Sequence, residues 1–114
     1  MGGDEMMGQR IDSAISVFIS FVVVGELYFG ARNSDQMAAN IARVDRIVAL
    51  HGVLYPTIAT TREYGVVRVA LKSAGRPIPD ADVWIAALAI ESGFTLVTRD
   101  RHFQGIDRLN VENW

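Results

Sequence analysis

The chain has 114 residues, 50% of them hydrophobic and 21% charged, which suits a single globular domain over residues 1–114 with one buried core. It contains no cysteine, which excludes a disulfide framework and a thiolate metal site and favours a cytoplasmic protein. The net charge of −2 excludes recognition of nucleic acid through bulk positive charge, and the longest apolar run, residues 15–24, is too short to cross a membrane.

The N-terminal region predicts one strand followed by one helix. Residues 1–14 show no clear periodicity, so we expect a frayed end or a short atypical helix there. The apolar residues 15–19 predict a short buried strand. Ser20 stands where a serine side chain caps a helix, and we expect that helix over residues 21–30.

A second helix and strand are expected next. Ser34 is the predicted N-cap of this helix. Its apolar residues recur at the spacing of one buried face: Met37, Ile41, Val44 and Val48. Gly52 is expected to end the helix in a left-handed conformation, and residues 53–55 predict a second short strand.

The third helical pattern is marked at both ends. Thr60 followed by Glu63 matches a capping box, in which each side chain satisfies a backbone amide at the helix start. The residues of its apolar face are Tyr64, Val67 and Leu71. Gly75 is expected to close this helix.

The C-terminal part predicts one more helix and two strands. Asp80 is expected to cap a helix over residues 81–92, with Gly93 behind it. Residues 94–98 and 110–112 predict short strands. Helices that alternate with short apolar strands favour an α/β fold with a short, mainly parallel sheet flanked by helices.

Glu26 is the acidic residue with the most apolar surroundings. It lies within residues 22–29, which are otherwise apolar and which we expect to be buried nearly all round. A charged carboxylate is costly there unless it is paired or binds a metal. An arginine partner is the structural alternative to a metal.

Asp80 and Asp82 stand at the start of an equally apolar helix. An acid in the first turn interacts favourably with the helix dipole, and an aspartate is a good N-cap, so both residues have a structural explanation.

Asp100 comes just after the strand predicted over residues 94–98. Turns accept aspartate freely, yet ligands of open α/β sheets bind at the carboxyl ends of strands. Carboxylates gathered from such elements repel one another unless a hard cation lies among them. Mg²⁺ or Mn²⁺ is therefore the expected cofactor.

Other chemistries find no support in the sequence. His51 and His102 lack the spacing of zinc ligands, and His102 is expected in a surface turn. No nucleophile elbow, phosphate-binding loop or dinucleotide fingerprint is present.

Three segments resemble, in order, the acidic motifs of PIN-domain proteins of the VapC toxin type. They are Gly25–Ala31, Ile78–Ala87 and Leu96–Phe103, so the resemblance covers roughly residues 15–114. It implies a three-layer PIN-like fold and a Mg²⁺- or Mn²⁺-dependent endoribonuclease. It further implies a toxin that cleaves RNA, forms a homodimer and is silenced by an antitoxin protein.

The resemblance also assigns roles to individual residues. Glu26, Asp82 and Asp100 would be the catalytic residues that hold the metal, with Asp80 as an accessory metal ligand. The arginines that flank Asp100 would contact RNA phosphates; they are Arg99 and Arg101, with solvated surface as the alternative.

One departure from the family concerns the N-terminus. Family members begin with a buried strand that ends in an aspartate, and nothing here matches it, since Asp4 follows two glycines instead of an apolar run. We therefore expect the first strand to be missing. The alternative function is a catalytically impaired protein that keeps only dimerisation or antitoxin binding, and the plainest reading is a structural α/β domain.

Overall fold

A computed structural model of the chain describes residues 18–113. Its internal contacts divide the chain into two units, Met1–Leu54 and Tyr55–Trp114, each of which is described by itself. The predictions for residues 1–14, for most of the strand over 15–19 and for a missing first strand lie outside the described residues. Within residues 18–113, no helix has the length and apolar character needed to span a membrane.

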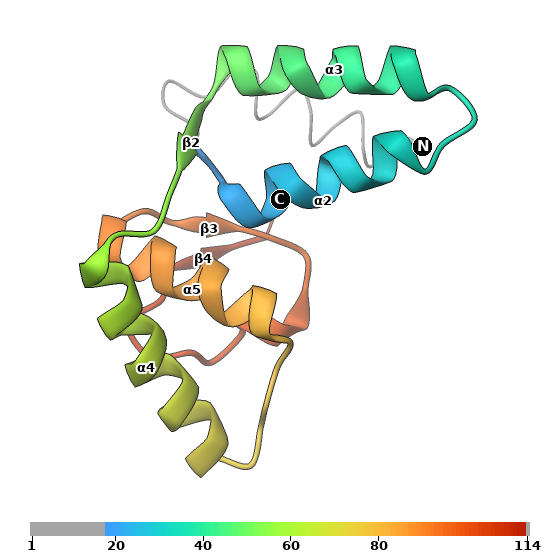
Figure 1. Cartoon of the computed structure of the whole chain (residues 1–114). Helices are drawn as coiled ribbons and strands as arrows, with labels where there is room; N and C mark the ends of the chain where they lie inside the picture. Colours follow the sequence, from blue (N-terminus) through green and yellow to red (C-terminus); the bar gives the residue numbers. More distant parts are fainter. Residues whose placement is uncertain (1–17, 114) are drawn as a thin grey trace. The chain divides into compact units, whose positions relative to one another are not determined.

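The first unit pairs two helices with two parallel strands (Figure 1). Its elements are β1 (Phe18–Ser20), α2 (Phe21–Arg32), α3 (Met37–Leu50) and β2 (Gly52–Leu54). The predicted cap of α2 is confirmed, because Ser20 Oγ accepts a hydrogen bond of 3.2 Å from the Val23 amide. The helices α2 and α3 pack against each other, and Val44 is the buried residue of α3.

Two predictions at the ends of α3 are wrong. Ser34 does not cap α3; its hydroxyl donates to the Ala31 carbonyl at 2.6 Å and accepts from Asn40 Nδ2 at 2.9 Å, which ties the end of α2 to the start of α3. Gly52 belongs to β2 instead of ending the helix. The Phe18 ring lies 2.5 Å from the point that a Cβ at Gly52 would occupy, so any other residue there would have to displace this ring from its place beside β2.

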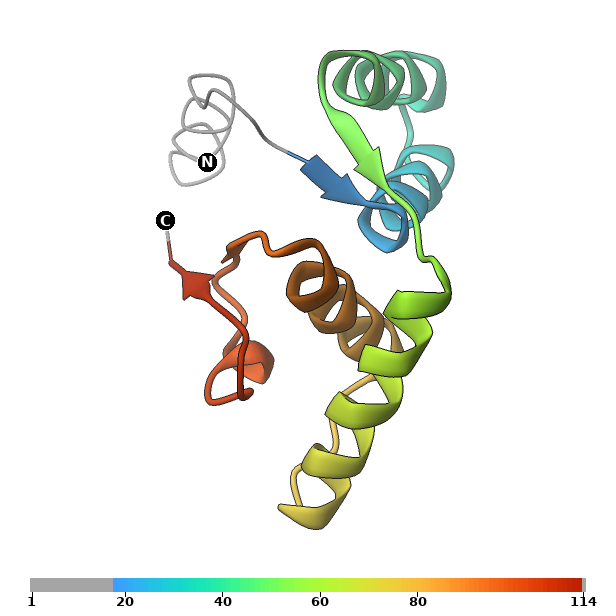
Figure 2. The same cartoon turned by 90° about the vertical axis from the view of Figure 1, so that its left-hand side faces the viewer.

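The second unit packs two helices, a 3₁₀ helix and a second parallel strand pair (Figure 2). Its elements are α4 (Ile58–Ser73), α5 (Asp80–Ser92), β3 (Leu96–Val97), η1 (Arg101–Phe103) and β4 (Val111–Glu112). The helix α5 packs against α4 and also contacts η1.

Helix α5 supplies most of the core of this unit. Its buried residues are Val83, Ile85, Ala86, Ala87, Leu88 and Ala89. Because α4 and η1 both contact it, the middle of α5 is buried, and its exposed acidic residues, Asp80 and Glu91, lie near its two ends. Val67 and Leu71 are the buried apolar residues of α4, and Tyr64 stacks on Trp84 with 4.1 Å between the ring centres.

The helix α4 starts three residues before the predicted position, and α5 starts one residue before it. The capping box of α4 consists of Thr57 and Thr60, so the helix begins at Ile58 and Thr60 is a buried residue of its first turn. Pro79 precedes α5, which makes Asp80 the first helical residue instead of the cap.

The predicted fold class is confirmed. Helices alternate with short strands, and both strand pairs, β1–β2 and β3–β4, are parallel. Among the described residues the strands form two two-stranded sheets, where the sequence predicted one short sheet. The single domain over residues 1–114 stays a prediction.

Candidate metal centre

Asp82 lies in the first turn of α5, where its backbone is fixed by an amide hydrogen bond of 3.0 Å to the Pro79 carbonyl. Its side chain is 18% exposed, which leaves it accessible only on one side. An acidic residue in this turn also interacts favourably with the helix dipole, so its charge is stabilised without a metal.

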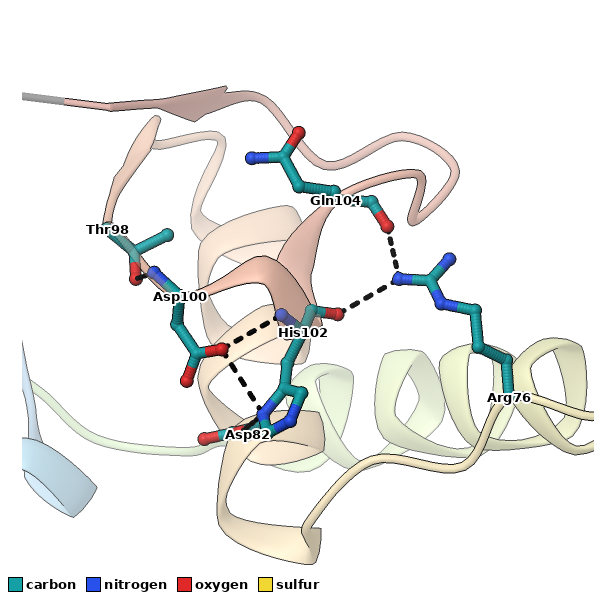
Figure 3. A network of polar contacts seen from close by, with 6 residues as sticks. All are labelled: Arg76, Asp82, Thr98, Asp100, His102 and Gln104. Atoms are coloured by element: carbon teal, nitrogen blue, oxygen red, sulfur yellow. Dashed lines mark hydrogen bonds and ion pairs between the residues drawn. The ribbon is translucent and has the colours of Figure 1, made fainter.

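Asp100 follows β3 and caps η1. Its Oδ1 accepts a hydrogen bond of 2.9 Å from the His102 amide, and its own amide donates to Thr98 Oγ1 at 3.0 Å (Figure 3). These two local bonds hold the carboxylate in place at the end of the strand.

His102 joins the two carboxylates (Figure 3). Its Nδ1 lies 2.8 Å from Asp82 Oδ2 and 3.3 Å from Asp100 Oδ1. The three ligand atoms are all within 4.8 Å of one another. The sequence predicts only a surface turn at His102 and does not predict this contact. The signal that could have indicated it is the Asp-x-His spacing of Asp100 and His102.

Two contacts secure η1 against the rest of the unit. Phe103 is buried, and Arg76 Nη2 donates to the carbonyls of His102, at 3.1 Å, and of Gln104 (Figure 3). Since His102 lies in η1 and Asp100 caps it, Arg76 indirectly positions two members of the cluster.

Asp80 lies apart from this cluster. The side chains of residues two positions apart on an α-helix point in directions that differ by about 200°. Asp80 therefore faces α4, whereas Asp82 faces η1. Asp80 Oδ1 accepts a hydrogen bond from the Tyr64 hydroxyl, and Arg68 Nη1 lies 3.7 Å from it. The hydrogen bond to the Asp80 carboxylate raises the pKa of Tyr64 above its ordinary value.

The remaining predicted site residues are exposed. Glu26 lies on α2 in the first unit, and the expectation that its segment is buried nearly all round is wrong, because Glu26 and Phe29 are both exposed. Arg99 and Arg101 flank Asp100 and are also exposed.

The cluster of Asp82, Asp100 and His102 suits a divalent cation. Carboxylate oxygens are ligands of Mg²⁺ and Mn²⁺, and a neutral imidazole nitrogen is a ligand of first-row transition metals. The donor atoms therefore fit the metal that the sequence predicts.

Comparison with known proteins identifies the family. The sequence profile of the PIN domain matches residues 5–109. The chain belongs to the PIN-domain family. Ribonuclease VapC1 of Haemophilus influenzae is 33% identical over 97 residues, which cover 84% of this chain and 72% of that protein.

Two solved structures of VapBC proteins are similar to the chain. The structure of VapBC-1 from nontypeable Haemophilus influenzae matches with a TM-score of 0.86 and 29% identity, over 96% of this chain and 85% of that one. VapBC-5 from Mycobacterium tuberculosis, described as a member of the VapBC family of toxin–antitoxin systems, matches with a TM-score of 0.70 and 26% identity, over 82% of this chain and 77% of that one. This PIN-domain chain is therefore of the VapC type.

Proposed function

We propose that this PIN domain, residues 1–114, is a metal-dependent endoribonuclease of the VapC toxin type that cleaves RNA phosphodiester bonds with Mg²⁺ or Mn²⁺. The observation that carries the proposal is the convergence of Asp82 and Asp100 on one ring nitrogen of His102. The family, and the relatives named as ribonucleases, support the reaction class.

The proposed ligands are Asp82, Asp100 and Glu26, with Asp80 as an accessory acid. Glu26 belongs to the other unit, and its inclusion rests on the sequence motif alone. A divalent ion held by these carboxylates would supply an activated water and would offset the charge that develops on the scissile phosphate.

The protein side chains have separate tasks in this proposal. The Asp100 carboxylate accepts a hydrogen bond from the His102 amide, and the Asp100 amide donates to Thr98 Oγ1; these two bonds would hold the carboxylate in a position to bind the ion. Arg99 and Arg101 are exposed on either side of Asp100, where a guanidinium can hold an RNA phosphate through two parallel hydrogen bonds. They would position the backbone of the substrate next to the carboxylates.

We further propose an antitoxin protein as the partner, together with self-association into a homodimer. Similar structures described as VapBC support the antitoxin. Large apolar side chains exposed on α4 of the second unit support a protein interface there: Ile58, Val66 and Val69. Light scattering at micromolar concentration tests the dimer, and a monomer contradicts it.

An RNA cleavage assay with and without Mn²⁺ tests the activity. Asp82→Asn should abolish Mn²⁺-dependent cleavage, because it removes a charged ligand from the cluster. Asp80→Asn is the matched control from the same helical turn, and it should reduce cleavage only a few-fold, because Asp80 contacts Tyr64. Cleavage that is unaffected by Asp82→Asn would refute the site.

The catalytically impaired alternative predicts a different result. The unaltered chain would then bind an antitoxin but cleave no RNA at any Mn²⁺ concentration.

A further inference from the structure

We propose that His102 is a nitrogen ligand of the divalent cation and that its imidazole makes the site prefer Mn²⁺ over Mg²⁺. This inference rests on the proposed metal site and adds to it a residue outside the acidic set.

The distances around His102 are those of ligands that share one ion. Two ligands at right angles on an ion with bonds of about 2.1 Å lie about 3.0 Å apart. His102 Nδ1 lies 2.8 Å from Asp82 Oδ2 and 3.3 Å from Asp100 Oδ1, on either side of that value. All three atoms lie within 4.8 Å of one another, so an ion can bind them together once the side chains adjust.

Hydrogen bonds and a buried neighbour hold the backbone of His102 next to the two carboxylates. The His102 amide donates to Asp100 Oδ1, and the His102 carbonyl accepts from Arg76 Nη2 (Figure 3). The adjacent Phe103 is buried in the core of the unit. The ring therefore starts from a fixed position beside both carboxylates, and because its side chain is 47% exposed, an ion can reach it from solvent.

The competing explanation is a structural hydrogen bond. In that case His102 only links η1 to α5, and an arriving ion displaces the ring from Asp82. The two explanations differ in whether a nitrogen atom remains bonded to the ion after it binds.

A nitrogen ligand changes which ion the site favours. Mg²⁺ prefers oxygen ligands and gives up its waters reluctantly, whereas imidazole binds first-row transition metals well. A site in which a histidine joins the carboxylates therefore favours Mn²⁺ over Mg²⁺ more strongly than a site with oxygen ligands alone.

Pulsed electron paramagnetic resonance of Mn²⁺ bound to the full chain tests this directly, because a bonded imidazole produces ¹⁴N modulation of the Mn²⁺ signal. The chain has two histidines, so His51→Ala is the matched control for His102→Ala. The modulation should be present in the unaltered chain and in His51→Ala, and it should disappear in His102→Ala and His102→Gln.

Metal titrations give a second readout. Loss of His102 should weaken Mn²⁺ binding by about tenfold or more, the effect typical of changes around metal ligands. Mg²⁺ binding should weaken less than about threefold, because Mg²⁺ gains little from a nitrogen ligand. Thermal denaturation identifies a variant that fails to fold. In that case the presence or absence of ¹⁴N modulation in the Mn²⁺ spectrum of the unaltered chain decides whether a histidine is bonded to the ion.

Each outcome has a distinct meaning. Bound Mn²⁺ without ¹⁴N modulation in the unaltered chain overturns the role of His102 and leaves the proposed metal site intact. Modulation that persists in His102→Ala also overturns it. A chain that binds no Mn²⁺ overturns both the inference and the proposed function.

Discussion

Arg76 offers the sharpest test of how the candidate site is built. It joins the loop after α4 to η1 through hydrogen bonds from Nη2 to the carbonyls of His102 and Gln104. Arg76→Met keeps a side chain of similar length and removes both bonds. We expect η1 to loosen and, with it, the alignment of Asp100 and His102.

The magnitude follows from the two bonds. A hydrogen bond with one charged partner contributes about 1.5–3 kcal/mol, and an exposed arginine retains only part of this because water competes for its donors. The two bonds together should contribute about 1–2 kcal/mol. For a domain of this size, each kcal/mol corresponds to a change of about 4–8 °C in Tm.

Circular dichroism melts and Mn²⁺ titrations of the same samples measure both effects. Arg62→Met is the matched control, since Arg62 is an exposed arginine on α4, and a surface change of this kind should stay within about 0.5 kcal/mol. Arg76→Met should melt lower than the control and bind Mn²⁺ several-fold more weakly. Equal melting temperatures and equal Mn²⁺ affinities for the two variants would refute the reasoning.

Three further predictions concern the same unit. Leu88→Ala should lower the free energy of unfolding, measured by urea denaturation, by about 2–5 kcal/mol, because Leu88 is 1% exposed in the core. A loss below about 1 kcal/mol contradicts that packing. Gly105→Ala should lower the free energy of unfolding by about 1–2 kcal/mol in the same assay, because Gly105 has a φ of 75° and Arg76 Nη1 lies 3.1 Å from the new Cβ. An unchanged free energy of unfolding argues against this backbone conformation. The hydrogen bond from Arg108 holds the pKa of Glu63 below its ordinary value of 4.5, so the stability from this pair is present above that pH and is lost as the pH falls through the lowered pKa. Glu63→Gln should therefore flatten the acidic part of the plot of Tm against pH, and an unchanged slope contradicts it.

The sequence by itself determined the family and the course of the chain. The acidic motifs around Glu26, Asp82 and Asp100 keep their order in any fold, so they identify a PIN domain without coordinates. The helix over residues 58–73 follows from its apolar periodicity, and the helix over residues 80–92 follows from an apolar run between an aspartate and a glycine; both signals are local. The predicted starts of both helices differ from the observed ones. Thr57 caps α4 in place of Thr60, and Pro79 occupies the cap position of α5 in place of Asp80.

Only the tertiary structure decided which side chains meet. Asp80 and Asp82 are equivalent candidates in the sequence, but the packing of α5 between α4 and η1 directs Asp80 to Tyr64 and Asp82 to His102. The contact between His102 and Asp82 depends on the docking of η1 against α5, which brings together residues that are twenty positions apart. Periodicity and capping act over one or two helical turns, whereas the direction in which a helix presents a carboxylate depends on which neighbours bury its other faces.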